Sequence, residues 1–339
     1  MKIAVDVMGG DKAPGEIIKG ALKASETYKD MKLILIGKND IIVKKINSSY
    51  SNKKNLIEIV NASENIAMNE TPSLALKRKK NSSINIGTKM VNENKADAFI
   101  SAGNTGAIMA AGVINIGRIP GIKRPSIATI YPSVSKKTLV LDGGANVDCK
   151  PENLNQFAIM GQIYTENVLG VKKPKIGLLN IGEEKKKGNK LTTESYKILE
   201  KEKRLYDFKG NVEGRDIFND SCDVIVCDGF IGNVVLKTTE GAVSLLMNKF
   251  KSTFKRNILT KLGALIIRPY LNQLKEDIDY RYYGGAPLLG IKGVVIISHG
   301  NSDAEAIYNA IKVARETVEK KVVDLIENKI NREGENNDS

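Results

Sequence analysis

Residues 1–10 read MKIAVDVMGG, a mostly apolar run that ends in a pair of glycines. A continuous rather than alternating apolar run is typical of a strand buried on both faces, as in a parallel sheet that helices cover on each side. Eight further runs of this kind follow along the chain: KLILIG, LIEIVNA, DAFISA, SIATIYP, TLVLD, KIGLLNIG, DVIVCDG and GVVIISHG. We interpret these nine segments as strands.

Longer amphipathic stretches separate the apolar runs, and this alternation predicts a three-layer α/β/α sandwich with a mostly parallel sheet. Three start signals support the intervening helices: Thr71 before Pro72, Pro151, and the capping-box spacing of Ser302 and Glu305. No internal repeat or Pro/Ser-rich linker divides the chain. Residues 1–330 are therefore interpreted as a single α/β domain, and residues 331–339 as a disordered tail.

The composition limits the class of protein. With 339 residues and 42% hydrophobic content, the chain can bury a substantial core. Lysine and arginine number 52 against 39 aspartates and glutamates, a net charge of +13 that favours phosphate, acidic proteins or lipid headgroups as partners and gives nucleic acid no specific support. Neither a secretory leader nor an apolar stretch of about 18 residues is visible, so we expect a protein that stays inside the cell.

Cysteine usage suggests neither disulfides nor zinc. Cys149, Cys222 and Cys227 have no CxxC spacing and no neighbouring histidines. We interpret Cys222 and Cys227, which flank an apolar run, as small packing residues.

A basic amphipathic pattern occupies residues 249–274. Apolar residues recur there every four positions beside lysines and arginines, which predicts a helix. Such a helix could form a dimer, lie on a membrane surface or cover the sheet, and the pattern alone does not choose among the three. The apolar residues are Phe250, Phe254, Ile258, Leu262 and Ile266, and the basic ones are Lys251, Lys255, Arg256, Lys261 and Arg268.

Glycine-rich turns predict a large anion-binding cleft. In a parallel α/β sheet, ligands bind beyond the carboxyl ends of the strands, where such turns offer backbone N–H groups. No GxGxxG run follows the first strand and no GxxxxGK[ST] occurs, so a nicotinamide or ATP enzyme is disfavoured. The seven turns are VMGGDKAPG at 7–15, SAGNTGA at 101–107, LDGGANVD at 141–148, NIGEEKKKGN at 180–189, CDGFIGN at 227–233, YGGAPLLG at 283–290 and SHGNSD at 298–303.

Signatures of a protein nucleophile or a metal centre are weak. There is no GxSxG run, and His299 is the single histidine available to any Ser-His or Cys-His system. Aspartates at strand ends could bind a cation, but their spacing gives no ligand set, and helix capping or hydrogen bonds to loop amides explain them as well. These aspartates are Asp6, Asp11, Asp142, Asp148 and Asp228.

Long strings of this sequence resemble the motifs of the PlsX family of phosphate acyltransferases, in order and over nearly the whole chain. The resemblance implies transfer of a fatty acyl group from acyl carrier protein to inorganic phosphate, without a cofactor. It also implies a fold related to isopropylmalate dehydrogenase and phosphotransacetylase. The strings are IAVDVMGGDKAPGEIIKGA, SAGNTGA, LDGGANVDCKPENLNQFAIMG, GLLNIGEEKKKGN, NVEGRDI, CDGFIGNVVLKTTEG and YGGAPLLGIKGVVIISHGNSDAEAI.

The same resemblance implies partners. It implies a homodimer, peripheral membrane contact through a helical hairpin at 249–283, and a separate membrane enzyme that passes the acyl group to glycerol 3-phosphate. One difference is the run Lys185–Lys187, where the family commonly has a more acidic stretch.

The chemistry of that reaction needs no strong base. A phosphate group is largely ionised near pH 7, because its second pKa is about 6 to 7, and a thiolate leaves readily. The enzyme must align phosphate beside the thioester and supply donors to the forming oxyanion. Asn104, Asn233 and His299 are the catalytic candidates, and an alanine variant that folds and keeps full activity would exclude its residue. The substrate-binding or phosphate-binding candidates are Gly9, Gly10, Asp11, Gly103, Thr105, Gly106, Asn146, Asn180 and Asp228.

Two other functions stay open from the residues alone. One is a phosphotransacetylase that acts on acyl-CoA, and the other is a non-catalytic scaffold that recruits lipid enzymes to the membrane. A basic rim could meet the acidic carrier protein, although solvated surface charge explains it equally. Its candidates are Lys185, Lys186, Lys187, Lys255 and Arg256.

Overall fold

The computed structural model describes residues 1–49, 56–278 and 284–337. Within them, eleven strands form one sheet in the order β3-β2-β1-β4-β11-β10-β5-β6-β9-β7-β8. The strands are β1 (Lys2–Asp6), β2 (Lys32–Gly37), β3 (Ile57–Asn61), β4 (Ala98–Ser101), β5 (Ser126–Pro132), β6 (Lys137–Leu141), β7 (Lys175–Leu179), β8 (Asp207–Val212), β9 (Val224–Val226), β10 (Ala286–Leu289) and β11 (Val294–Ile297).

The sheet is mostly parallel, as predicted. Strand β10 runs antiparallel to both of its neighbours, β11 and β5, and β5 runs antiparallel to β6. The other described pairings are parallel. Strands β10 and β5 therefore join two halves of the sheet, and within each half the strands run parallel to one another. All nine predicted strands are present, whereas β8 and β10 were not predicted.

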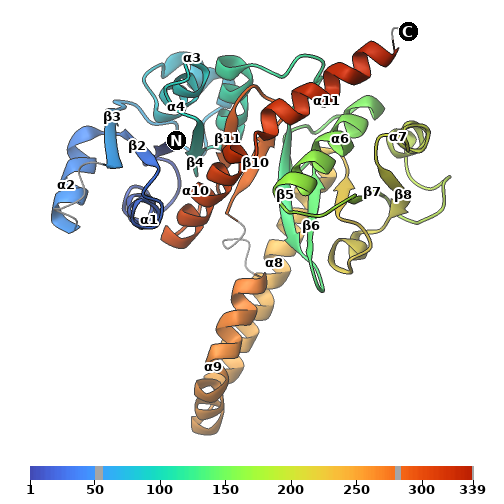
Figure 1. Cartoon of the computed structure of the whole chain (residues 1–339). Coiled ribbons are helices and arrows are strands. Elements are labelled where there is room, and N and C mark those ends of the chain that lie inside the picture. Colours follow the sequence, from blue (N-terminus) through green and yellow to red (C-terminus); the bar gives the residue numbers. More distant parts are fainter. Residues whose placement is uncertain (50–55, 279–283, 338–339) are drawn as a thin grey trace.

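Helices cover both faces of each half (Figure 1). In the half that contains β1, α1 and α10 share one core with the strands, and α3, α4 and α5 pack on the opposite core. In the other half, α6, α7 and α11 cover one face, and the 3₁₀ helix at Gly214–Phe218 packs on the opposite core. Besides the hairpin, the helices are α1 (Gly15–Thr27), α2 (Asn39–Ser49), α3 (Pro72–Arg78), α4 (Ser83–Asn92), α5 (Thr105–Ala111), α6 (Pro151–Asn167), α7 (Lys190–Lys201), α10 (Ala304–Glu319) and α11 (Val322–Asn337), with a π-helix at Gly112–Ile116 and a 3₁₀ helix at Gly214–Phe218.

A helical hairpin projects from this body (Figure 1). It consists of α8 (Gly229–Phe254) and α9 (Ile258–Ile278), which pack side by side. The prediction of one amphipathic helix over 249–274 is therefore wrong, because the chain turns between Phe254 and Ile258. The hairpin also begins earlier than the predicted residue 249, and 279–283 lie outside the described residues. Among the helices that the structure describes, none combines the length and apolarity that crossing a bilayer would require.

Two predicted helix ends differ in detail. The cap of α10 is Asp303, whose carboxylate accepts from the backbone N–H of Ala306, whereas the Ser302 hydroxyl donates to the carbonyl of His299. The capping-box prediction was therefore displaced by one residue. Helix α6 does begin at Pro151. At the other end of the chain, α11 continues to Asn337, past the predicted start of the tail, and 338–339 lie outside the described residues.

Candidate active site

A cavity of about 380 Å³ lies where the two halves of the sheet meet. Its walls come from the first turns of α5, from β5, from the loop after β6, from α8 and from the loop that joins β11 to α10. The turns after β4, β6 and β11 contribute to it, and α/β sheets commonly bind ligands beyond the carboxyl ends of their strands. The lining residues are Thr105, Gly106, Met109, Ile127, Thr129, Ile130, Gly143, Gly144, Asn233, Leu236, Lys237, Glu240, Gly285, Ala286, Ile297, Ser298, His299, Ser302 and Ala306.

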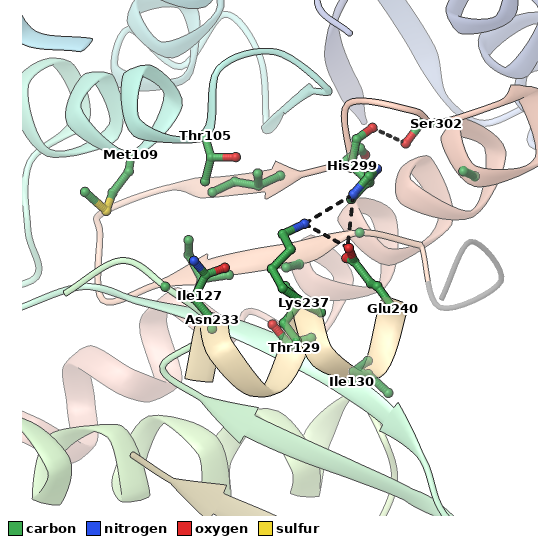
Figure 2. Close-up of a pocket in the computed structure, with 18 of the residues that line it drawn as sticks. Thr105, Met109, Ile127, Thr129, Ile130, Asn233, Lys237, Glu240, His299 and Ser302 are labelled. Carbon is green, nitrogen blue, oxygen red and sulfur yellow. Dashed lines mark hydrogen bonds and ion pairs between the residues drawn. The ribbon is translucent and has the colours of Figure 1, made fainter. Parts of the chain in front are cut away.

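The charged side chains of the cavity gather at one end. Figure 2 shows Lys237, Glu240 and His299 there, with Met109, Ile127 and the uncharged Asn233 away from them. Such a cavity suits a ligand with a charged head and an apolar body.

One face of α8 supplies much of the polar wall. Asn233, Lys237 and Glu240 are spaced by four and three residues, so they project from the same side of the helix. Asp228 caps this helix, because its carboxylate accepts from the backbone N–H of Ile231 at 2.8 Å. The cap and the helical spacing together place these three side chains in the cavity.

His299 completes the polar end from the opposite wall. Its Nδ1 accepts the backbone N–H of Asn301 at 3.1 Å, so in the neutral ring the proton is on Nε2. Nε2 lies 3.6 Å from the carboxylate of Glu240 and 3.5 Å from Nζ of Lys237. Lys237 and Glu240 form an ion pair at 2.9 Å. Three side chains from two elements thus form one connected group (Figure 2).

This group keeps Glu240 ionised. Burial raises the pKa of the Glu240 carboxyl, but hydrogen bonds from His299 and Lys237 outweigh that effect and hold the pKa below its ordinary value. A carboxylate at neutral pH accepts hydrogen bonds and donates none. Glu240 can therefore hold Lys237 and His299 in place, and it cannot serve as a proton donor.

The predicted catalytic candidates occupy different positions. Asn233 and His299 line the cavity, whereas Asn104 is not among the lining residues. The Asn104 side chain caps α5 by accepting from Ala107 N–H, and its amide donates to three carbonyl groups of the loop at 67–70. Asn104 thus fixes the loop beside the cavity.

Among the predicted binding candidates, Thr105 and Gly106 line the cavity. The turns at 9–11 and 103 do not, and instead they hold the neighbouring loops together. An added Cβ on Gly9 would overlap the backbone of Gly103, and the N–H of Asp11 donates to the carbonyl of Gly300 at 2.7 Å. Gly10 has a φ of +97° and lies against the same carbonyl.

Three further binding candidates are not among the residues that line the cavity. Asn146 is buried, and its side-chain amide donates to Pro125 and Asp142. Asn180 donates to the carbonyl of Lys187 at 3.0 Å and stabilises its own loop. Asp228 is used as the α8 cap. In each case the polar side chain that was predicted to bind a ligand forms a local hydrogen bond with the protein.

Two of the strand-end aspartates, Asp6 and Asp142, serve structural purposes. Asp142 is fully buried and accepts from loop amides that include Ile127 and Asn146, while Asp6 accepts from the Ser101 hydroxyl. Burial raises the pKa of both carboxyls, although these hydrogen bonds oppose the shift. In the described parts of the chain, no group of three or more His, Cys, Asp or Glu side chains has the arrangement to hold a metal ion.

The cysteines are protonated at neutral pH. Burial raises the pKa of Cys149 to about 12 and that of Cys222 to about 11, and it raises the pKa of Cys227 well above the ordinary value. Because the thiolate is the reactive form, none of these three is suited to act as a nucleophile. Cys222 and Cys227 pack in an apolar core, as the sequence predicted.

Sequence reasoning missed Lys237, Glu240 and Ser298. The first two follow Asn233 at helical spacing, and that spacing would have revealed them once a helix was assigned to this segment. Ser298 precedes His299 directly, so its side chain emerges from the same loop. The basic run 185–187 lies apart from the cavity lining, and Lys185 there forms an ion pair with Glu200 at 2.6 Å.

Residues 1–325 match the family model described as "Fatty acid synthesis protein". Curated relatives include the phosphate acyltransferase of Halothermothrix orenii, which is 60% identical over 99% of this chain and 100% of that protein. The phosphate acyltransferase of Heliobacterium modesticaldum is 50% identical over 97% of this chain and 98% of that protein.

Solved structures share the fold at low sequence identity. EutD phosphotransacetylase from Staphylococcus aureus matches with a TM-score of 0.59 and 16% identity, over 94% of both chains. A phosphotransacetylase from Streptococcus pyogenes matches with a TM-score of 0.60 and 16% identity, also over 94% of both chains. The likeness confirms the predicted fold class.

Proposed function

Since the chain belongs to the fatty acid synthesis protein family and is a phosphate acyltransferase, we propose that it transfers a long-chain fatty acyl group from acyl carrier protein to inorganic phosphate. The observation that carries this proposal is the polarity of the cavity, with Lys237 and His299 at one end and Met109 and Ile127 at the other. Phosphate suits the first end. The acyl carbons next to the thioester suit the second.

The reaction is a direct displacement. An oxygen of hydrogen phosphate attacks the thioester carbonyl carbon, a C–O bond forms, and the C–S bond breaks. The thiolate of the carrier's prosthetic group leaves and takes the proton that the phosphate brought. The products are an acyl phosphate and a free thiol, and the same steps in reverse regenerate the thioester. Phosphate is the nucleophile, in keeping with the raised pKa values of the cysteine thiols.

Neutral donors assist this displacement. The amide of Asn233, the hydroxyl of Thr105 and the Nε2–H of His299 all belong to the cavity wall. Such donors stabilise charge that develops on the carbonyl oxygen, and they do most where water is excluded. Asn104 supports them indirectly, because it fixes α5 and the loop beside it.

The decisive experiment incubates the purified protein with long-chain acyl carrier protein, with and without inorganic phosphate. We expect phosphate-dependent release of free thiol and a product that hydroxylamine traps as the hydroxamate. A parallel reaction with acyl-CoA of the same chain length separates the two donors. Turnover confined to acyl-CoA would refute the carrier-protein donor, and thiol release that ignores phosphate would refute the acceptor.

The product indicates the next step. An acyl phosphate is a reactive mixed anhydride, so an acyltransferase that takes the acyl group for glycerol 3-phosphate would consume it near its source. The net charge of +13 suits a carrier protein that is acidic. Lys186, Lys187, Lys255 and Arg256 stay candidates for that contact.

The hairpin is proposed to form the homodimer contact and to touch the membrane surface. Large apolar side chains are exposed along it, including Leu259 near the tip at 79% and Ile266 at 76%. Lys255 and Arg256 lie in the turn between α8 and α9. A surface that is both apolar and basic suits an anionic bilayer, and the apolar flanks suit a second copy of the hairpin.

Vesicle binding tests the membrane contact. We expect the protein to sediment with vesicles that contain phosphatidylglycerol, and Leu259→Asp to lose at least about half of this binding, because the charge must leave water. Light scattering of both proteins reports whether the dimer persists. Equal sedimentation of both proteins, or none with the native chain, would contradict the contact that we propose for the tip.

A further inference from the structure

Lys237 is the one lysine or arginine among the described residues that line the cavity. An i,i+3 ion pair such as Lys237–Glu240 is commonplace on a helix surface and contributes little by itself. Here the pair has a third member, because Nζ of Lys237 also lies 3.5 Å from Nε2 of His299 on the opposite wall. The lysine therefore points across the cavity end, not along the outer face of the helix (Figure 2).

The ammonium group of Lys237 has more hydrogen-bond donors than its ion pair with Glu240 uses. A lysine side chain carries three N–H donors, and Glu240 takes one of them at 2.9 Å. Its side chain is 55% exposed, so an anion that enters the cavity can reach it without breaking the ion pair. Because the ion pair with Lys237 compensates the negative charge of Glu240, Glu240 repels an incoming anion less strongly.

A second observation marks the same end as a ligand site. The hydroxyl of Ser298 is buried and lines the cavity, and within the described residues it has no hydrogen-bond partner. Buried polar groups are nearly always paired in folded proteins, so an unpaired hydroxyl in a cavity wall calls for a ligand atom. Ser298 is adjacent to His299, and it therefore adds a polar group to the end where Lys237 lies.

We propose that Lys237 binds the acceptor phosphate, with the Ser298 hydroxyl beside it, and that Glu240 is a positioning residue that fixes Lys237 and His299. The assignment rests on the proposed phosphate-acceptor reaction and names the residues that recognise the acceptor. Lys237 and Ser298 act on binding of phosphate. Glu240 acts on alignment, since it contacts both Lys237 and His299.

Steady-state kinetics separate these effects. For Lys237→Met, the KM for inorganic phosphate is expected to rise about 10- to 100-fold while the KM for the acyl donor stays within about twofold, since a charged hydrogen bond is lost at one substrate only. Lys237→Arg retains the charge and is expected to recover part of the loss. Lys249→Met is the matched control, because Lys249 is exposed farther along the same helix and does not line the cavity.

Glu240→Gln tests the positioning role. We expect kcat to fall about tenfold, because Lys237 and His299 are no longer held in alignment. The phosphate KM should change little, because the loss of the negative charge at residue 240 favours phosphate and offsets the weaker positioning of Lys237. Thermal unfolding with phosphate alone gives an independent readout. Phosphate should raise the melting temperature of the native protein and of Lys249→Met, and it should raise that of Lys237→Met much less.

The outcomes distinguish the two proposals. A native protein that binds phosphate through Lys237 but forms no acyl phosphate would overturn the proposed reaction and leave the binding site standing. Active variants of Lys237 with an unchanged phosphate KM would overturn the binding site alone. A Glu240→Gln protein with the native kcat would remove the positioning role.

Discussion

An alanine in place of His299 is expected to lower kcat for acyl phosphate formation by about 10²-fold, with a smaller effect on the free energy of unfolding. The imidazole lines the cavity and presents Nε2–H at the end where phosphate is proposed to bind. Loss of one donor to a developing oxyanion typically costs about 10²- to 10³-fold in rate. Single-turnover measurements with saturating phosphate would report this effect on the chemical step.

Two amide replacements separate the two nitrogens of His299. Glutamine can place an N–H near the position of Nε2, so His299→Gln is expected to recover about tenfold of the lost rate. Asparagine can accept from Asn301 as Nδ1 does, which preserves the loop contact at 3.1 Å, but its shorter amide does not reach as far. An asparagine variant as active as the glutamine variant would indicate that His299 serves the loop and not the reaction.

The sequence predicted most of the sheet because the signal was continuous apolarity, which reports burial on both faces. Strand β8 lacks that signal, since DFKGNV lies at the edge of the sheet and exposes Asp207 and Lys209. Strand β10 is four residues long and lies inside a run rich in glycine and proline, which reads as a turn. Its antiparallel pairing depends on partners remote in sequence, which a local pattern does not reveal.

The site was predicted less completely for a related reason. Five of the seven glycine-rich turns contribute residues to the cavity lining, whereas the turns at 7–15 and 180–189 do not. Many polar groups in these turns hold backbone, as Asn104 and Asn180 do. The side chains of Lys237 and Glu240 were missed because residues 229–248 mix glycines with β-branched residues, and such a segment has weak intrinsic helix propensity. Packing of this segment against the sheet overrides that weakness, and packing is a property of the folded chain.

Gly232 shows how closely α8 must approach the sheet. It is buried in the second turn of the helix, and an added Cβ would overlap the main-chain oxygen of Asp142. Backbone at this position cannot move aside as a flexible side chain could. The lack of a side chain at Gly232 therefore sets the distance between the helix and the loop after β6, and with it the positions of Asn233, Lys237 and Glu240.

Gly232→Ala is accordingly expected to destabilise the protein by about 3 kcal/mol, as overpacking of a tight contact does, and to lower activity by about 10²-fold. The activity loss follows because the face of α8 that lines the cavity must shift by up to about 1 Å, which misplaces its side chains. Gly241→Ala is the matched control, since no heavy atom lies within 4 Å of its added Cβ in the same helix. There the better helix propensity of alanine should stabilise by about 0.5–1 kcal/mol. Urea denaturation and the acyl phosphate assay measure both effects, and equal behaviour of the two variants would show that contact with Asp142 does not position α8.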